Sequence, residues 1–240
     1  MKLPFAWPHL LRYLSTRHTP VLEAVTDDAW RRGDIVVRYR GGSRLLVRGK
    51  PDRARLTRLF DLDCDPAAIA RHFARCSLMG PRVRAVPGLR IPGTWEPFEL
   101  VLRTILGQQV SVAGAQTLFS RLIGLCPSCT PDEVASADLG KVGLTRQRAE
   151  TLKTVARLFR ESPDPPLIGV RGIGPWTLAY LAIRLGRDRD AFPSSDLGLL
   201  RATGCSSSRE LEKLAEKWRP FRGYAAHYLW SVEAPRALDE

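Results

Sequence analysis

The chain has 240 residues, 44% of them hydrophobic, and a formal net charge of +12 from 37 basic and 25 acidic residues. This length and hydrophobic content are typical of a folded protein with one large or two smaller domains and argue against a disordered chain. No apolar run reaches the roughly 20 residues of a membrane span, and the proline-broken N-terminus lacks the apolar core of a signal peptide. We therefore expect a cytoplasmic protein without a membrane partner. The basic excess favours a polyanionic partner.

The N-terminal part is the region in which we predict strands. Two runs rich in β-branched and apolar residues, 34–40 and 44–48, flank Gly41-Gly42-Ser43 and predict a β-hairpin. Apolar spacing predicts helices around this hairpin, over 6–15, over 52–59 and after Asp65-Pro66. A single hairpin gives this region only a small predicted sheet.

The rest of the chain has helical patterns. A segment dense in proline and glycine, 80–93, predicts an extended connector. Beyond it the predicted helices span 95–106, 111–125 with Ser111 as N-cap, 143–159, 208–218 and 221–232. We therefore predict an α+β protein, with an N-terminal domain over 1–86 and an all-helical region over 87–240.

The chain has five cysteines, at positions 64, 76, 126, 129 and 205. Their odd number and irregular spacing argue against a disulfide framework. Cys126 and Cys129 have the spacing of metal ligands, but no second pair completes a zinc site. We expect free thiols.

A glycine turn precedes an apolar helix at 167–179. Gly172 and Gly174 permit a tight turn between two helices, and Pro175 suits the first turn of the second helix. The free N–H groups at such a helix start can bind a phosphate without reading a base. A purely structural helix–helix turn is the alternative.

Two aromatics and one acid follow this turn. Trp176 and Tyr180 are four residues apart and share a helix face. Such a pair is commonly part of a core, and Asp196 alone is explained as the N-cap of a short helix. An aspartate can cap a helix and still present a carboxylate oxygen to a cavity, so both readings of Asp196 are compatible.

Several segments together resemble the DNA-3-methyladenine glycosylase II family, the AlkA-like branch of the helix–hairpin–helix DNA glycosylases. They fall in the family's order at 58–66, 87–93, 105–112, 167–179, 192–196 and 215–225, and the resemblance as a whole extends over essentially the entire chain. The resemblance implies a shortened, TBP-like β-containing domain followed by an all-α helix–hairpin–helix glycosylase body. It implies a monomer that acts on double-stranded DNA with alkylated bases.

The resemblance also implies site residues. Asp196 matches the catalytic aspartate, and the pocket for a flipped base is matched by three aromatics, Trp176, Tyr180 and Trp230. The positions matched to DNA contacts are Gln108, Gln109, Gly172, Ile173, Gly174 and Thr177. No cofactor is expected to be required, and a structural monovalent cation at the carbonyls of Ile168 and Val170 is the one metal that the resemblance suggests.

The chemistry of these residues suits removal of a cationic alkylpurine. An electron-rich aromatic cleft attracts a cation, and one carboxylate can stabilise positive charge on the sugar and orient water. Bifunctional relatives carry a lysine where Trp176 stands, and no lysine lies between Gly172 and Gly198. We therefore predict a monofunctional glycosylase that leaves an abasic site.

Two alternatives stay open at this point. One is a glycosylase for other damaged or deaminated bases, and the other is a non-catalytic helix–hairpin–helix DNA-binding protein. Two departures from the family pattern also matter. Some relatives have an apolar residue at the position of Gln109, which the resemblance assigns to the gap left by the flipped nucleotide, and the predicted sheet is short.

Overall fold

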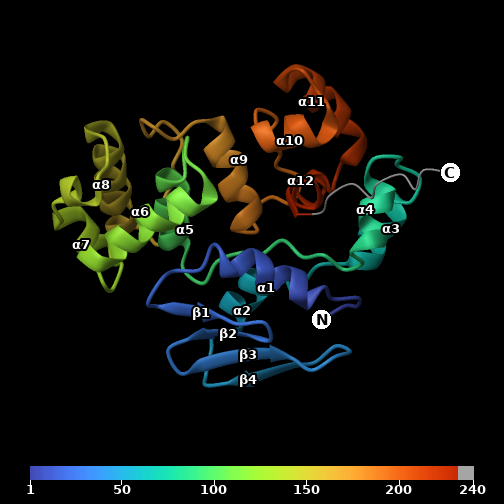
Figure 1. The fold of residues 1–240 in the computed structure, drawn as a ribbon, viewed down its shortest axis with the longest axis horizontal. Helices are drawn as coiled ribbons and strands as arrows, with labels where there is room; N and C mark the ends of the chain where they lie inside the picture. The colour runs from blue at the N-terminus through green and yellow to red at the C-terminus, as the bar shows by residue number, and fades with distance from the viewer. Residues whose placement is uncertain (232–240) are drawn as a thin grey trace.

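The computed structural model describes residues 1–231, and none of its helices is long and apolar enough to cross a membrane. At one end lies an antiparallel sheet of strands β1 (Glu23–Val25), β2 (Ala29–Arg32), β3 (Ile35–Tyr39) and β4 (Leu45–Arg48), in that order. Helices α1 (Trp7–Ser15) and α2 (Arg53–Phe60) lie on the side of the sheet that faces the helical body (Figure 1).

The predicted hairpin is confirmed as β3–β4, which pairs Val37 with Val47 across a turn whose Gly41 and Gly42 both have positive φ. The prediction of a single hairpin is wrong, because β1 and β2 extend the sheet to four strands. These two strands have only three and four residues, too few for an alternating pattern to be visible. Their pairing depends on a neighbouring strand.

The sheet and its helices share an aromatic core. Trp30 of β2 is fully buried, with its ring centroid 5.8 Å from that of Phe60 and 5.2 Å from that of Trp95. Burying such large apolar surfaces is the main stabilising contribution that a short sheet can obtain. Trp95 therefore joins the sheet to the segment that leads into the helical body.

An ion-pair cluster forms a second link between the sheet and the body. Arg32 of β2 donates two hydrogen bonds to Glu99, of 2.5 and 2.9 Å, and a longer one of 3.3 Å to Glu23. Thr19 also donates to Glu99, at 2.5 Å. Burial, together with the nearby charge of Glu99, raises the pKa of Glu23 to about 7. The cluster thus places two buried carboxyls around one guanidinium.

Helices α3 (Pro66–Phe73) and α4 (Met79–Ala85) follow the sheet in sequence. The extended connector predicted over 80–93 is wrong for its first part, where α4 forms. Its Pro81 stands in the first turn, where the missing N–H has no intrahelical partner to lose. Both helices contribute to the core of the C-terminal helices, so Phe73 and Met79 share a cluster with Tyr228. The division at residue 86 stays a prediction.

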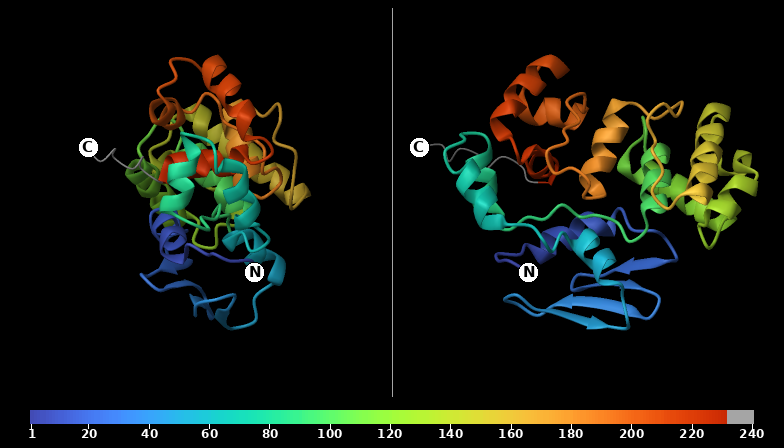
Figure 2. Two further views of the ribbon diagram at one scale, coloured as in Figure 1. Left: turned by 90° about the vertical axis from the view of Figure 1, so that its right-hand side faces the viewer. Right: turned by 180° about the vertical axis from the view of Figure 1, so that it is seen from behind.

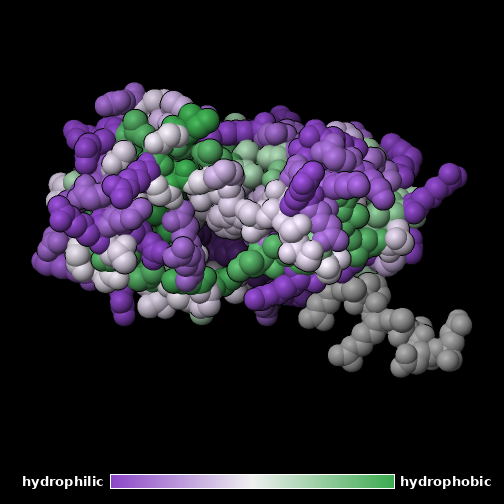
Figure 3. Space-filling model, turned by 90° about the horizontal axis from the view of Figure 1, so that it is seen from above, coloured by the Kyte–Doolittle hydropathy of each residue, from purple (hydrophilic) through white to green (hydrophobic). Residues whose placement is uncertain are grey.

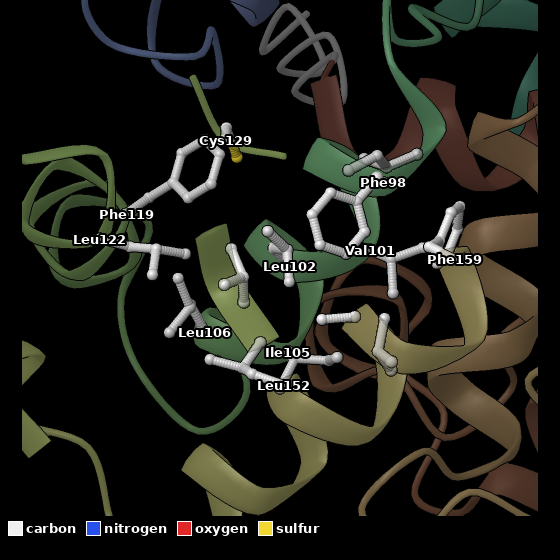
Figure 4. Packing of buried hydrophobic residues seen from close by; sticks show 14 of the residues in the cluster. Phe98, Val101, Leu102, Ile105, Leu106, Phe119, Leu122, Cys129, Leu152 and Phe159 are labelled. Carbon is white, nitrogen blue, oxygen red and sulfur yellow. The ribbon is translucent and has the colours of Figure 1, made fainter. Parts of the chain in front are cut away.

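The helical body is organised around α5 (Pro97–Leu106), which is buried on every side from Phe98 onward. Around it lie α6 (Val112–Leu125), α7 (Pro131–Ser136), the 3-10 turn Leu139–Val142 and α8 (Arg146–Glu161). Figure 4 shows side chains of α5, among them Phe98, Val101 and Ile105, packed against those of α6 and α8. Ser111 caps α6 as predicted, since its hydroxyl accepts from the Gly114 N–H at 3.1 Å.

The last elements are α9 (Pro175–Arg184), α10 (Leu197–Thr203), α11 (Ser208–Ala215), the 3-10 turn Glu216–Trp218 and α12 (Arg222–Ser231). Helix α9 stands between the α5–α8 group and the α10–α12 group, as Figure 1 and the right-hand view of Figure 2 show. Residues on α9 therefore face both groups. All five cysteines are free, as expected, and no cluster of metal-ligating side chains occurs within residues 1–231.

Candidate active site

The two glycines of the hairpin before α9, Gly172 and Gly174, have different structural roles. Gly172 has φ +90°, and a Cβ there would lie 2.6 Å from Oγ1 of Thr151. Both its conformation and its contact with α8 therefore demand glycine. Gly174 is the N-cap of α9, with extended φ and open space around it. Pro175 begins the helix, as predicted, so the next N–H groups have no intrahelical acceptor.

The loop between α5 and α6 is tied to this hairpin by Gln108. Its side-chain amide donates to the carbonyl of Gly172 at 2.9 Å and to the hydroxyl of Thr177 at 3.1 Å. Arg148 of α8 donates to the Gln108 carbonyl at 2.8 Å. The adjacent Gln109 is exposed and has φ +60°, a left-handed conformation unusual for a residue with a Cβ. Gln108 thus holds the loop while Gln109 projects from it.

The six positions matched to DNA contacts are not equally accessible. The side chains of Ile173 and Thr177 are buried, with 7% and 3% of their surface exposed. These two residues can offer only backbone groups to a ligand. Gln109, Gly172 and Gly174 are exposed, and Gln108 is half-buried.

The three aromatics singled out in the sequence come together. Trp176 and Tyr180 stack with ring centroids 5.3 Å apart and planes 7° from parallel. Trp230 arrives from α12 and meets Tyr180 edge to face at 5.7 Å. All three are half-buried and border one cavity, so they form an aromatic wall with accessible surface.

Asp196 lies at the edge of this wall. It caps α10, since its Oδ1 accepts from the Leu199 N–H at 2.8 Å. The same oxygen accepts from Nε1 of Trp230 at 3.0 Å, and Oδ2 accepts from Nε1 of Trp176 at 2.8 Å. Hydrogen bonds to an ionised carboxylate are about twice as strong as neutral ones. Asp196 is therefore both a helix cap and a carboxylate that two indoles fix in place.

Two residues that sequence reasoning missed, Arg184 and Tyr13, contact Tyr180 of this wall. Arg184, only 2% exposed, donates to the hydroxyls of Tyr180 at 2.6 Å and Tyr13 at 2.9 Å. It also donates to the carbonyls of Pro92 and Gly93. Burial raises the pKa of Tyr13 to about 12. Burial would also raise the pKa of Tyr180, but the charges of Arg184 and Arg17, together with the hydrogen bonds to Tyr13 and Arg184, outweigh burial and lower this pKa.

Two adjoining hollows meet at Asp196. A cavity of about 520 Å³ is bordered by the aromatic wall, Tyr13 and several arginines. A groove of about 1060 Å³ runs past the loop at 107–111 and the hairpin glycine Gly172. Seen from above the view of Figure 1, the surface of the protein is hollowed near its middle (Figure 3). The residues that border both are Gly107, Val110, Ser111, Trp176, Asp196 and Gly198. Their sizes fit a small-molecule cavity that opens into a larger surface groove.

Solved structures share this arrangement of elements. A 3-methyladenine DNA glycosylase of Schizosaccharomyces pombe, in complex with abasic DNA, superposes with a TM-score of 0.61 and 24% identity over 68% of this chain and 95% of that one. An 8-oxoguanine glycosylase/lyase of Clostridium acetobutylicum, in complex with double-stranded DNA, gives a TM-score of 0.67 and 16% identity over 85% of this chain and 83% of that one. The fold is that of the helix–hairpin–helix DNA glycosylases.

Sequence comparisons narrow this class. A family model described as the AlkA N-terminal domain matches residues 50–96. The DNA-3-methyladenine glycosylase 2 of Escherichia coli is 30% identical, with 96% of this chain and 95% of that protein covered. A probable bifunctional transcriptional activator/DNA repair enzyme of Mycobacterium tuberculosis is 31% identical, and this chain spans 56% of its length. The chain belongs to the DNA-3-methyladenine glycosylase 2 (AlkA) family.

Proposed function

We propose that this protein excises alkylated, positively charged purines such as 3-methyladenine and 7-methylguanine from double-stranded DNA, as the first step of base excision repair. The observation that carries the proposal is the Asp196 carboxylate, which two indoles hold at the mouth of an aromatic cavity. A protein that only bound DNA would need neither the cavity nor the fixed carboxylate. Family membership supports the same reaction.

DNA is proposed to bind across the groove beside the cavity. The first N–H groups of α9, after Gly174, suit a backbone phosphate, because a helix N-terminus offers free donors and positive dipole. A base must leave the stack before its glycosidic bond is accessible, which costs a few kcal/mol. Gln109 projects from the neighbouring loop and is proposed to fill the gap that the base leaves.

In the cavity the aromatic faces would hold the base and the carboxylate would face the sugar. A cationic purine gains roughly 0.5–2 kcal/mol from contact with an electron-rich ring. As the bond from C1′ to the base nitrogen breaks, its electron pair stays with the base, which leaves neutral. Positive charge then develops on the sugar, and Asp196 stabilises it. Water adds to C1′, and its proton is released to the carboxylate or to solvent.

The proposed reaction stops at an abasic site. A lyase needs an amine to form a Schiff base with the sugar, and within the described chain the residues that border the cavity and the groove include no lysine. Trp176 is proposed to stand where bifunctional relatives carry this lysine, and its indole N–H donates to Asp196. Strands treated with this enzyme are expected to break only after alkali.

We propose that catalysis requires no cofactor and that a monovalent cation, where one binds, has a structural role in the hairpin. The candidate ligands are the carbonyls of Ile168 and Val170. The Val170 carbonyl accepts from the Ile173 N–H at 3.0 Å and keeps a second lone pair. A higher melting temperature in potassium than in an equal concentration of a bulky organic cation would support this role.

The proposed function is tested by release of free base from methylated duplex DNA, measured chromatographically, with the strands examined for breaks before and after alkali. Release of methylated purines by the wild-type protein, with breaks only after alkali, is the expected result. Binding without release would refute the enzymatic proposal. Release with immediate strand breaks would refute only its monofunctional character.

A further inference from the structure

Gly198 lies two residues after Asp196, in the first turn of α10, and borders both the cavity and the groove. Its φ is outside the left-handed region, so the backbone at this position accepts any L-residue. Alanine would also favour a helix more than glycine does. The conformation of the chain therefore does not account for the glycine, and the space beside it must be considered.

That space lies between the carboxylate and an indole. A Cβ at Gly198 would be 3.0 Å from Oδ1 of Asp196, 3.6 Å from Cδ1 of Trp230 and 3.8 Å from its Nε1. The first distance is closer than ordinary van der Waals contact, so even a methyl group would press on the carboxylate. A longer side chain would extend into the passage where the two hollows meet.

We propose that Gly198 is a specificity-determining residue, which keeps this passage open for purines whose N-alkyl group is larger than a methyl. The inference rests on the proposed function. It is supported by the size of the cavity, about 520 Å³, which lies in the range that holds drug-sized ligands. The bulk of a larger substituent would occupy the space beside Asp196 that a side chain at 198 would fill.

The test compares two substrates that differ in substituent size and carry the same charge on the same ring. Duplex DNA is alkylated to contain 7-methylguanine or 7-benzylguanine, and release of each base is measured under single-turnover conditions, corrected for spontaneous loss. The variants are Gly198→Ala and Gly198→Leu. Gly124→Ala is the matched control, because Gly124 lies in α6 and a Cβ there meets no atom within 4 Å.

The wild-type protein is expected to release both bases. In Gly198→Ala the ratio of benzyl to methyl release should fall about tenfold, the effect that one added carbon has in a filled pocket, and in Gly198→Leu benzyl release should be lost. Displacement of Asp196 would slow the release of both bases equally, and the ratio of benzyl to methyl release would stay unchanged. Thermal unfolding of the variants should stay close to wild type, and Gly124→Ala should keep the wild-type ratio.

Each contrary outcome has a distinct meaning. Equal losses for both bases in a folded Gly198→Ala protein would overturn the role in specificity. Release of 7-methylguanine but not of 7-benzylguanine by the wild-type protein would overturn this inference and leave the proposed function intact. Release of neither base by a protein that binds the DNA would remove the proposed function itself.

Discussion

Trp176 donates its indole N–H to Oδ2 of Asp196 at 2.8 Å, across 20 residues of sequence, and Trp230 donates to the other carboxylate oxygen. Each tryptophan side chain thus makes two kinds of contact. Its ring borders the cavity, and its N–H edge orients the acid. Under the proposed function, recognition of the base and positioning of the carboxylate therefore depend on the same side chains, and suitable substitutions should separate the two effects.

Replacing Asp196 by asparagine is expected to reduce base release by at least a thousandfold while leaving DNA binding unchanged or tighter. Asparagine caps a helix as well as aspartate does, so α10 should persist. The negative charge is lost, however, and with it the stabilisation of the sugar cation, an effect commonly worth several kcal/mol. Single-turnover base release and affinity for abasic-site DNA provide the measurements.

The matched control for this experiment is Asp138→Asn. Asp138 is also an N-cap, accepting from the Gly140 N–H at 3.2 Å, and it borders neither the cavity nor the groove. It should retain wild-type release. Substantial excision by Asp196→Asn would remove this carboxylate from the centre of the mechanism.

Trp230→Phe and Trp230→Ala should have different consequences. Phenylalanine keeps an aromatic face but cannot donate to Oδ1 of Asp196. A hydrogen bond to a charged group contributes about 1.5–3 kcal/mol, so release of cationic and neutral bases should fall alike, roughly tenfold or more. Alanine also removes the face, and the additional loss should be greater for a cationic base. Release of 7-methylguanine and of a neutral purine, compared across both variants, would show whether these two effects separate.

Much of the fold was predictable because its signals are local. Side chains that cap helices occur next to the helices they start, as at Asp52, Asp65 and Ser111. The turn at Gly41-Gly42 likewise marks its own hairpin. In contrast, β1 and β2 are defined by hydrogen bonds to other strands. Helix α4 includes Pro81, and a proline in the sequence usually indicates the end of a helix. Local patterns do not carry that information.

The same distinction applies to the site. Trp176, Tyr180 and Asp196 lie within 21 residues of one another, and the spacing of the two aromatics indicates a shared helix face. Arg184, one turn further along that face, could have been found by extending the spacing. Tyr13 could not, because it reaches the site only when α1 packs beside α9, an arrangement that depends on the whole fold. The role of Gln109 in filling the gap stays a prediction.

Alanine substitutions at the two hairpin glycines should affect stability differently, because only Gly172 has a left-handed φ and a close neighbour. Gly172→Ala should lower the free energy of unfolding by about 1–3 kcal/mol, because it combines a left-handed φ with a contact 2.6 Å from Thr151. Gly174→Ala should fold normally, since a Cβ there meets no atom within 4 Å. Thermal unfolding of both variants measures this difference.

Gly174→Ala should nevertheless weaken DNA binding. The added methyl lies at the helix N-terminus where a phosphate is proposed to approach, and the loss should be similar on every DNA sequence. Binding isotherms at several salt concentrations provide the measurement, and affinity should fall steeply with salt for wild type and variant. Wild-type affinity in Gly174→Ala would argue that the phosphate binds elsewhere.

The cluster that joins the sheet to α5 should make stability depend on pH. The pKa of Glu23 is about 7 in the folded protein, mainly through burial, against 4.5 for an unperturbed glutamate. The folded state therefore binds more protons between these values, and the contribution of Glu23 to stability is lost as pH rises from about 4.5 to 7. The amide in Glu23→Gln cannot ionise, so this variant does not lose stability at position 23 as the pH rises. Arg32 keeps its two hydrogen bonds to Glu99.

The stability of Glu23→Gln relative to wild type should consequently increase by about 3 kcal/mol between pH 4.5 and pH 8, at 1.4 kcal/mol for each unit of pKa. Denaturant unfolding of both proteins across this range measures the change. Glu150→Gln, on the exposed surface of α8, is the control for replacing one glutamate by glutamine. A constant difference for Glu23→Gln would mean that Glu23 is ionised in the folded protein throughout, with Arg32 compensating both carboxylates despite their burial.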